Sequence, residues 1–290
     1  MTRLTHDDIK AICPQLAAYD DHLMSVTGRP LLGIGAAAAG IDDWEAWRHQ
    51  ASTIRMAVVP IRGGLGIISG FADCVCGILA HLGFDAAVTP GSDVAGFAHA
   101  VASGAQVIMA ADDDRFVAFC LRQGRTVDNS RATAFGFIAG LDGMAGGLAG
   151  AEVLVLGCGP VGRWCVAALL QRRARVRVAD PQHDRTTALA QWVQRRDGQS
   201  IQVITDGELA LGSHDLIVDA THAAHLIRAR HVTPATRIAA PGVPCGLSPR
   251  ARQKLDGRFL HDPLQIGVAA MACEAARMMI DACKEDKPCP

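Results

Sequence analysis

A glycine-rich turn between a short apolar run and a helical pattern constrains this chain more than any other feature. Five consecutive strand-forming residues, Glu152–Leu156, lead into Gly157-Cys158-Gly159-Pro160-Val161-Gly162, and a helical pattern follows to about Gln171. The next apolar run ends at Asp180, 23 positions after Gly157. A bare G-x-G-x-x-G would be a weak signal. With this strand, helix and acid around it, the motif is the fingerprint of a βαβ unit that binds a dinucleotide.

Each member of the fingerprint has its own task. Gly157 permits the tight turn, and Gly159 leaves room for a pyrophosphate at the helix N-terminus, where free N–H groups and the helix dipole favour an anion. Gly162 lets the helix and the strand pack closely. Asp180 would accept hydrogen bonds from the adenosine ribose and repel a 2′-phosphate, so the sequence predicts NAD rather than NADP as the cofactor.

Two later segments are predicted at the same rim of the sheet. Asp219-Ala220-Thr221 lies at the carboxyl end of a predicted strand, where open α/β sheets place their ligands. Ala240–Cys245 follows the next strand, and it reads equally well as a wall beside the nicotinamide or as a plain turn. The predicted cofactor-binding residues are Gly157, Cys158, Gly159, Pro160, Val161, Gly162, Asp180, Thr221, Pro241 and Gly242.

Short apolar runs alternate with helical patterns along the chain, as expected for parallel sheets with crossover helices. A length of 290 residues favours two domains. We therefore predict an α/β protein with a C-terminal Rossmann dinucleotide-binding domain and a smaller N-terminal α/β domain with a short parallel sheet. The predicted boundaries are 1–127 for the N-terminal domain, 128–149 for a connecting helix, 150–266 for the Rossmann domain, and 267–290 for a C-terminal helix and tail.

Three strand–helix units are predicted within the N-terminal domain. Their strands are 57–61, 86–89 and 106–110, and their helices run from about Ile67 to His81, from Ser92 to Ala102, and from Asp112-Asp113-Asp114 to Leu121. Upstream, Pro14 interrupts the helical pattern of residues 5–27 and predicts a kink or two short pieces. Asp42 is the N-cap candidate for a helix that extends to Thr53.

Composition and spacing exclude several classes of function. A net charge of −1 with one Tyr, eight Phe and four Trp argues against nucleic-acid binding. The N-terminus lacks the apolar region of a secretory signal, and no stretch predicts a membrane span. The cysteines include no C-x-x-C pair, which fits a reducing cytoplasm, and His222 and His225 lack a third ligand, so no metal is expected. Whether the chain forms a homodimer stays open.

Candidate substrate contacts lie where strands of the first domain end. Gly63-Gly64-x-Gly66 could form a backbone nest or simply turn the chain. The run Asp112-Asp113-Asp114 could be a helix-capping cluster, but three adjacent carboxylates repel one another and only one cap is needed. A cationic partner for one of them is therefore reasonable. Asp262 ends the last predicted strand before Pro263, where a turn-forming Asp-Pro is an equal alternative.

A series of short motifs runs in order through residues 1–32 and 57–272. They are Leu4-Thr5-x-x-Asp8, Val59-Pro60, Gly63-x-x-Gly66-Ile67-Ile68-x-x-Phe71, Gly83-Phe84-Asp85, Asp93-Val94-x-Gly96, Met109-x-x-Asp112-Asp113 with Phe116, Gly157–Gly162, Pro241–Cys245 and Pro263-Leu264-x-Ile266-Gly267. In this set the chain resembles the pyrrolysine-biosynthesis dehydrogenase family, PylD. It departs from the family at Asp262, where the family carries Glu, at the less polar Gly64-Leu65, in residues 35–56, which have no counterpart, and after about Met279.

The resemblance implies an amine oxidation. The family takes 3-methyl-D-ornithine joined by an amide to the ε-nitrogen of L-lysine, transfers hydride from the terminal amine carbon to NAD, and releases ammonia as the pyrroline ring closes. It implies substrate binding by Leu4, Gly63, Gly64 and Phe71, with Leu4 and Phe71 in an apolar lid. Asp112 and Asp262 are the catalytic candidates, as carboxylates that relay the ammonium proton and stabilise the iminium.

Two other functions remain as alternatives. A different amino-acid, diamine or imine dehydrogenase on the same scaffold would share the fingerprint and Asp112. A non-catalytic NAD-binding sensor would need the cofactor fold but no carboxylate in the cleft. The motifs of the first domain favour the enzyme, and they predict a small dipeptide-like substrate as its partner.

Overall fold

The computed structural model describes residues 4–66 and 68–285, and it separates into two compact units. The first unit consists of Met1–Leu23, Arg29–Gly136 and Leu264–Pro290, and the second of Met24–Gly28 and Phe137–Pro263. Ile67, where a helix is predicted to begin, lies outside the described residues. No helix of the described part is long and apolar enough to cross a membrane.

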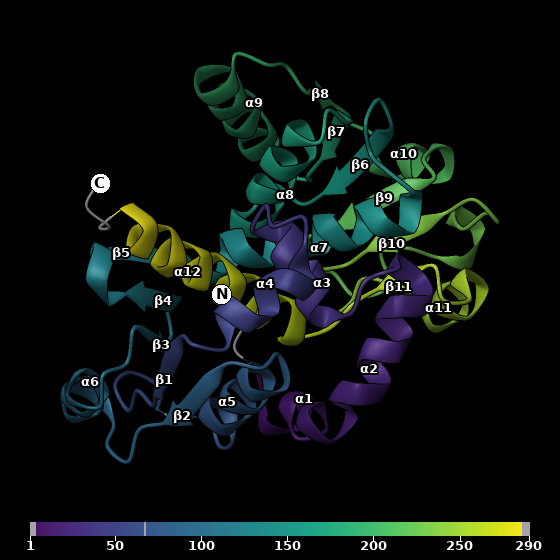
Figure 1. The fold of residues 1–290 in the computed structure, drawn as a ribbon. Helices are drawn as coiled ribbons and strands as arrows, with labels where there is room; N and C mark the ends of the chain where they lie inside the picture. Colours follow the sequence, from purple (N-terminus) through teal and green to yellow (C-terminus); the bar gives the residue numbers. More distant parts are fainter. Residues whose placement is uncertain (1–3, 67, 286–290) are drawn as a thin grey trace. The chain divides into compact units, whose positions relative to one another are not determined.

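The first unit is built on a five-stranded mixed sheet (Figure 1). Its order is β2-β1-β3-β4-β5, and β2, β1 and β3 pair in parallel, as predicted, whereas β4 and β5 are antiparallel additions. The strands are β1 (Arg55–Val59), β2 (Asp85–Val88), β3 (Val107–Ala111), β4 (Phe116–Cys120) and β5 (Arg125–Asp128). The carboxyl ends of β1 and β3 therefore lie side by side, because these two strands are neighbours.

The predicted helix after the three aspartates is wrong, because residues Phe116–Cys120 form β4. The run is short and apolar at nearly every position, so its periodicity does not distinguish a helix from a buried strand. The aspartates instead occupy the turn of the β3–β4 hairpin, where the N–H of Asp112 donates to the carbonyl of Arg115 at 2.9 Å. They are not a helix-capping cluster.

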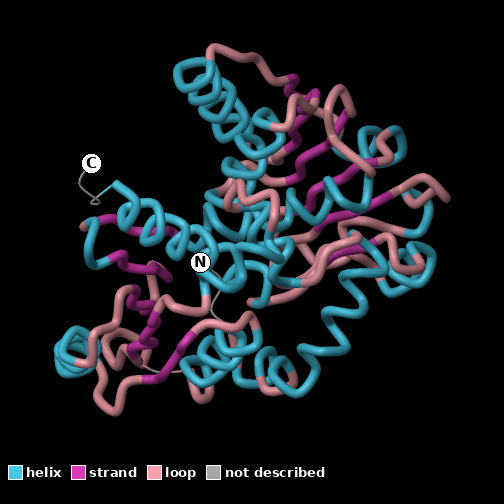
Figure 2. The backbone as a smooth tube through the Cα atoms, viewed as in Figure 1, coloured by secondary structure: helices cyan, strands magenta, loops and turns pink. Residues whose placement is uncertain are grey.

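Helices cover this sheet and close the core of the first unit (Figure 2). Ala57, Val59 and Ile108 on the strands pack with Ala100. A Cβ on Gly35 would lie only 2.8 Å from the carbonyl oxygen of Ala269, so the two helices that carry these residues pack closely there. The helices are α1 (His6–Ile9), α2 (Ile12–Thr27), α3 (Leu31–Ala38), α4 (Trp44–Ala51), α5 (Phe71–His81), α6 (Asp93–Ala102), η1 (Leu121–Gln123), α7 (Asn129–Ala145) and α12 (Gln265–Glu285), of which α2 and α7 continue into the second unit.

Two local predictions near the N-terminus have different outcomes. The predicted break is present, since α1 and α2 are separate helices and Pro14 lies in the first turn of α2, where its missing N–H costs little. The predicted N-cap Asp42 is wrong by one residue. Asp43 caps α4, because its Oδ1 accepts from the N–H of Ala46 at 3.0 Å.

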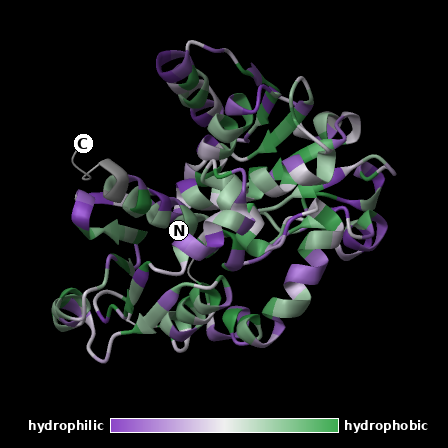
Figure 3. Ribbon diagram, in the orientation of Figure 1, coloured by the Kyte–Doolittle hydropathy of each residue, from purple (hydrophilic) through white to green (hydrophobic). Residues whose placement is uncertain are grey.

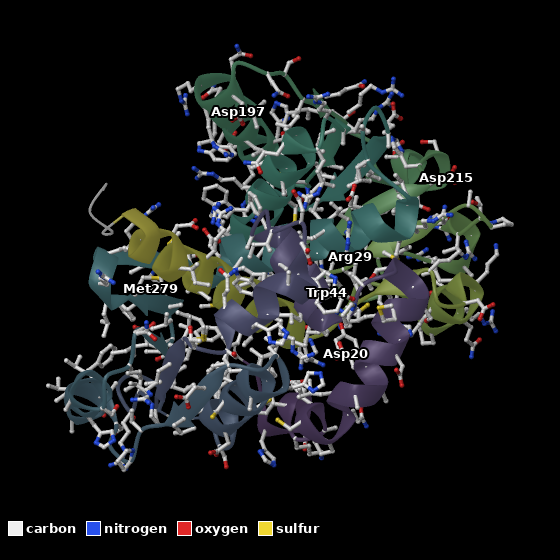
Figure 4. All side chains as sticks on the ribbon, viewed as in Figure 1. Asp20, Arg29, Trp44, Asp197, Asp215 and Met279 are labelled. Atoms are coloured by element: carbon white, nitrogen blue, oxygen red, sulfur yellow. The ribbon has the colours of Figure 1, made fainter. Side chains whose placement is uncertain are left out.

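A carboxylate of α2 ties three helices together. Asp20, labelled in Figure 4, accepts from the backbone N–H of Leu31 at 2.6 Å through Oδ1 and contacts Nε2 of His81 at 2.7 Å through Oδ2. Leu31 begins α3 and His81 ends α5. This bond at the start of α3 satisfies an N–H group that the helix itself leaves without an acceptor.

The second unit is a six-stranded parallel sheet with the order β11-β10-β9-β6-β7-β8. Numbered from β6 as strand 1 and read from the β8 end, this is 3-2-1-4-5-6, the strand order of a Rossmann domain, which confirms the predicted fold. Its strands are β6 (Glu152–Leu156), β7 (Arg175–Ala179), β8 (Gln202–Val203), β9 (Leu216–Asp219), β10 (Arg237–Ala239) and β11 (Phe259–Leu260). The strand order reverses between β6 and β9, so ligands are expected at the carboxyl ends of these two strands.

The helices of the second unit complete its hydrophobic core. Leu154, Ile217 and Ile238 on three strands pack with Ala251 and Leu255, and all five side chains are buried. In Figure 3, β6 is coloured hydrophobic, whereas α9 carries hydrophilic residues on its outer side. The helices are α8 (Pro160–Gln171), α9 (His183–Asp197), α10 (Gly207–Ser213), η2 (Ala229–His231) and α11 (Pro249–Leu255).

Candidate active site

The glycine-rich loop joins β6 to α8 in the conformation that its sequence predicts. Gly157 has a φ of +89°, and its N–H donates to the carbonyl of Ala179 at 2.9 Å. A Cβ on Gly162 would lie 1.9 Å from the carbonyl oxygen of Gly157, so only glycine allows this approach. A Cβ on Gly159 would meet no atom within 4 Å. The loop therefore needs two of its glycines for its own fold and leaves open space at the third.

That open space lies at the N-terminus of α8. Gly159 is the N-cap, and Pro160 occupies the first helical position, where its missing N–H costs no hydrogen bond. The first-turn N–H groups that follow, at Val161 and Gly162, have no acceptor within the helix. A phosphate oxygen can accept from such groups in a field that favours negative charge. The residues therefore fit the pyrophosphate of a dinucleotide.

Asp180 is held in place by the same loop. Its Oδ2 accepts from the N–H of Cys158 and its Oδ1 from the N–H of Gln182, each at 2.8 Å. Its side chain is partly exposed. Since each carboxylate oxygen has a second lone pair, Asp180 can still accept from ribose hydroxyl groups. Burial, together with the charge of Asp180, raises the pKa of the Cys158 thiol to about 12, so this thiol is neutral.

A buried carboxylate joins the two loops that follow β9 and β10. Asp219, with no exposed surface, accepts through Oδ1 from the N–H of Thr221 at 3.1 Å and from its hydroxyl at 2.7 Å. Its Oδ2 accepts from the N–H of Gly246 at 3.1 Å. Burial raises the pKa of Asp219, and the bonds from Thr221 and Gly246 oppose that rise. Asp219 thus positions Thr221 relative to the segment Pro241–Gly246.

The sequence placed Thr221 and Pro241–Gly242 at this rim but did not predict the link made by Asp219. The link spans 27 residues and leaves no mark in a local pattern. Its one sequence signal is an acid at the end of an apolar strand. Glycines complete the arrangement, because a Cβ on Gly242 would lie 2.1 Å from the carbonyl oxygen of Thr221, and one on Gly246 would lie 2.1 Å from Oδ2 of Asp219.

Two residues after β11 extend this rim. Asp262 is buried, with 5% of its surface exposed. His261 is partly buried, stacks on the ring of Phe259, and makes a hydrogen bond from Nδ1 to the carbonyl oxygen of Ala240 at 2.8 Å. Sequence reasoning singled out Asp262 but not His261. The fingerprint loop, Asp219, the segment Pro241–Gly246 and His261 all belong to the second unit.

In the first unit, the loop after β1 is held by an aspartate of the β3–β4 turn. Oδ2 of Asp113 accepts from the N–H of Leu65 at 2.7 Å, and a Cβ on Gly64 would lie 2.0 Å from the same oxygen. Gly64 has a φ of +68°. The geometry supports a turn at Gly63–Gly64 that accommodates a neighbouring carboxylate, and it brings this loop beside the aspartate run.

Asp112 occupies a different position in that turn. Its Oδ1 accepts from the N–H of Asp114 at 2.9 Å and from that of Arg115 at 2.7 Å, and its side chain is exposed. Both bonds use the same oxygen and come from the backbone. They fix the carboxylate in the hairpin turn and leave Oδ2 able to accept from a cation.

The other predicted substrate contacts, Phe71 and Leu4, also belong to the first unit. The rings of Phe71 and Phe116 meet edge to face, with centroids 5.5 Å apart, and Phe116 pairs with Ala111 across the hairpin. Nδ1 of His6 donates to the carbonyl oxygen of Ser69 at 3.0 Å, so α1 lies against the segment before α5. Leu4, two residues before His6, is partly buried.

No group of three or more His, Cys, Asp or Glu side chains in the described part of the chain could hold a metal ion. His222 contacts the carbonyl oxygen of Val243 through Nδ1 at 3.0 Å. Because this carbonyl oxygen engages Nδ1, that nitrogen is not available as a metal ligand.

Comparisons with known proteins agree with the motifs. Residues 8–127 match the family model described as Pyrrolysine biosynthesis protein PylD, N-terminal domain. A pyrrolysine synthase of Methanosarcina barkeri is 30% identical over 271 residues, which cover 93% of this chain and 97% of that protein. A pyrrolysine synthase of Methanosarcina acetivorans is 29% identical over 272 residues, which cover 93% and 98%. The chain belongs to the pyrrolysine synthase family, PylD.

Solved structures share the fold at much lower identity. A quinate dehydrogenase from Corynebacterium glutamicum in complex with NAD has a TM-score of 0.53 and 16% identity, covering 77% of this chain and 93% of that one. A shikimate dehydrogenase from Aquifex aeolicus has a TM-score of 0.53 and 15% identity, covering 79% and 93%. These likenesses confirm the α/β class and the Rossmann-like unit.

In this PylD family member the predicted site residues fall into two groups, one in each unit. The first unit contains Leu4, Gly63, Gly64, Phe71 and Asp112, and the bond from Leu65 to Asp113 brings the loop after β1 beside the turn after β3. The second brings the fingerprint loop, Asp180, Thr221 and the Pro241–Gly242 segment to the carboxyl ends of β6, β7, β9 and β10. Asp262 follows β11 in the second unit, so the two catalytic candidates belong to different units.

Proposed function

We propose that this chain is an NAD-dependent oxidoreductase that oxidises the terminal amine of 3-methyl-D-ornithyl-N6-L-lysine and so forms the pyrroline ring of L-pyrrolysine. Two observations together carry the proposal. The chain has a glycine-rich loop shaped to bind a dinucleotide, and it is 30% identical to a protein named pyrrolysine synthase over nearly the whole length of that protein. A cytoplasmic location belongs to the same proposal.

The choice of NAD rests on Asp180. A bound NAD would supply an oxidised nicotinamide ring that accepts a hydride. The N–H groups of Val161 and Gly162 would hold the pyrophosphate, and Asp180 would accept from the ribose hydroxyls. Because the backbone N–H groups of Cys158 and Gln182 anchor the Asp180 carboxylate, its negative charge stays where a 2′-phosphate would have to bind. NADP is disfavoured by that repulsion.

The reaction requires that the substrate amine become neutral. It reaches the site as an ammonium, with an ordinary pKa near ~10.4, and its lone pair is needed to expel a hydride from the adjacent carbon. Loss of the hydride leaves an iminium, with a C=N bond and a positive charge on nitrogen. One water adds to this carbon and ammonia leaves to give an aldehyde, on which the α-amine of the same ornithine condenses with loss of one water. The ring closes readily because both reacting ends are already tethered.

Two carboxylates of the chain are proposed to assist. Asp112 would bind the incoming ammonium and stabilise the iminium through Oδ2, while its Oδ1 stays bound to the hairpin backbone. Asp262 would act in the same sense with less reach, since it is one methylene shorter than the Glu of the family pattern. Leu4 and Phe71 would exclude water, which strengthens these charge contacts.

The test is a direct assay. Purified protein is mixed with the ornithyl-lysine dipeptide and either NAD or NADP, and the reaction is followed at the NADH absorbance and by product mass. We expect a product of the mass of pyrrolysine with NAD and at least ~10-fold lower kcat/KM with NADP. L-lysine and D-ornithine serve as control amines. Equal turnover of the control amines would favour a general diamine dehydrogenase, and NAD binding without any turnover would favour a sensor.

A further inference from the structure

His261 directly follows β11, the strand that pairs with β10 in the second unit (Figure 1). Its Nδ1 lies 2.8 Å from the carbonyl oxygen of Ala240, the residue that follows β10. Its ring stacks on Phe259, with centroids 5.8 Å apart and planes 20° apart. Two contacts, one polar and one apolar, therefore hold the ring in a single orientation.

The contact with Ala240 also determines which nitrogen carries the proton. A carbonyl oxygen can only accept a hydrogen bond, so Nδ1 must donate. In the neutral ring Nε2 is then the atom with the free lone pair, and no hydrogen bond joins Nε2 to any of the described residues. In its neutral form His261 thus offers an oriented nitrogen lone pair at the carboxyl end of the strands, where open α/β sheets bind their ligands.

The charges around His261 suit a group that gains a proton. Asp219, on β9, is buried; burial raises the pKa of its carboxyl group, and the positive charge of a protonated His261 is among the interactions that oppose this rise. Asp262 follows His261 directly in the chain. Arg252, on α11, lies 5.3 Å from the centroid of Phe259, the ring on which His261 stacks. Asp219 is therefore an acidic neighbour whose charge interacts favourably with a protonated His261.

The chemistry of the proposed reaction needs such a group. A general base works best when its pKa lies near the working pH, and an imidazole with an ordinary pKa near ~6.5 meets that condition better than a carboxyl group near ~4. The carboxylates, in contrast, are suited to stabilising a neighbouring positive charge, which they do without taking up the proton.

We propose that His261 is a further catalytic residue, the base whose Nε2 removes the proton from the terminal ammonium of the substrate before the hydride leaves. The proton moves from the substrate nitrogen to Nε2, the nitrogen regains its lone pair, and the imidazolium later returns the proton to water. This inference rests on the proposed function, because that function supplies the ammonium. It assigns the proton to His261 and the charge to the carboxylates.

The decisive variant is His261→Asn, whose amide can still donate to Ala240 but lacks a base. His225→Asn is the matched control, because His225 is exposed and its φ of +58° is a conformation that Asn tolerates. We expect His261→Asn to lower kcat by ~10²-fold or more near neutral pH, with an NAD Kd within about twofold of the unchanged protein. The loss should shrink toward pH 10, where solvent takes the proton, and added imidazole should restore part of the rate.

A loss of kcat no larger than that of His225→Asn, or one that is the same at every pH and insensitive to imidazole, would overturn the proposal. The structural basis has its own test that needs no turnover. Imidazole nitrogen NMR should show the neutral ring of His261 as the Nδ1–H tautomer. An Nε2–H tautomer would contradict the proposal even in an active enzyme. Absence of turnover in the unchanged protein would contradict the proposed function instead.

Discussion

At the scale of single residues, the three glycines of the fingerprint differ in what they make room for. Gly157 and Gly162 serve the fold, whereas a Cβ at Gly159 would meet nothing within 4 Å. We therefore expect Gly159→Ala to keep the thermal stability of the protein and to raise the NAD Kd by at least ~10-fold, or ~1.4 kcal/mol, because the methyl group occupies the place of the pyrophosphate.

The control for this variant is Gly212→Ala. Gly212, on α10, also has open space around its Cβ position, but it is far in sequence from the fingerprint. It should change neither Tm nor NAD affinity to any comparable degree. Fluorescence titration with NADH and a thermal melt of each variant are sufficient. Unchanged NADH binding by Gly159→Ala would show that no dinucleotide phosphate lies beside that glycine.

Asp112 gives a second prediction at this scale. Asp112→Asn keeps the size and the oxygen that accepts from Asp114 and Arg115, but removes the charge. We expect turnover of the dipeptide to fall by ~10²-fold while the NAD Kd stays unchanged, since no predicted cofactor contact belongs to the first unit. Asp114→Asn, an exposed position in the same turn, should leave turnover within about twofold. Equal effects of both variants on kcat would reduce Asp112 to a residue of the hairpin turn.

What could be predicted at the residue scale was what depends on local pattern. The fingerprint was readable because its strand, glycines, helix and acid lie within one βαβ unit. The links from Asp219 to Gly246 and from Asp113 to Leu65 join positions 27 and 48 residues apart. Such links depend on which strand ends become neighbours, and that requires the strand order.

At the scale of elements, the strands β6 and β9 of the second unit were the most predictable, because buried parallel strands form continuous apolar runs. The error at β4 came from the same rule. Phe116–Cys120 is equally apolar, and nothing in so short a run shows whether it continues as a helix or turns back as a hairpin. The turn chemistry was visible in the aspartates, since an Asp side chain that bonds the backbone two or three residues on favours a turn.

Helix α1 provides the prediction at this scale. It contributes one buried side chain, Ile9, and it lies against the segment before α5 through His6 and Ser69. Deleting residues 1–10 should therefore raise KM for the dipeptide by ~10-fold or more and leave the NAD Kd unchanged. His6→Ala, which removes the contact to Ser69 alone, should raise KM in the same direction by less. Steady-state kinetics at saturating NAD measure both, and an unaffected KM in the deletion would remove α1 from substrate binding.

At the scale of the whole molecule, the chain does not follow its linear order. Residues Leu264–Pro290 group with the first unit although they follow the second in sequence, and α12 in that stretch packs on α3 at the approach of Gly35 to Ala269. An ion pair between Arg131 of α7 and Glu274 of α12 adds to this packing. The sequence predicted a helix over 128–149 and one after 267 but none at α3, and its pattern does not show which apolar faces meet. Long-range packing of this kind is set by the complete fold.

The division into two units leads to the last prediction, which concerns where each ligand orders the backbone. Every residue predicted to bind the cofactor lies in Phe137–Pro263, and every residue predicted to bind the substrate, including those of the apolar lid, lies in the first unit. In hydrogen exchange, NAD alone should slow the amides around Gly157–Gly162, Asp180–Gln182 and Thr221, because bound ligand suppresses local opening. A non-reactive dipeptide analogue added with NAD should further slow the amides of residues 4–10, 63–66, 68–71 and 112–116. Protection of those first-unit segments by NAD alone, or no added protection with the analogue, would contradict this assignment of substrate to Leu4, Gly63, Phe71 and Asp112.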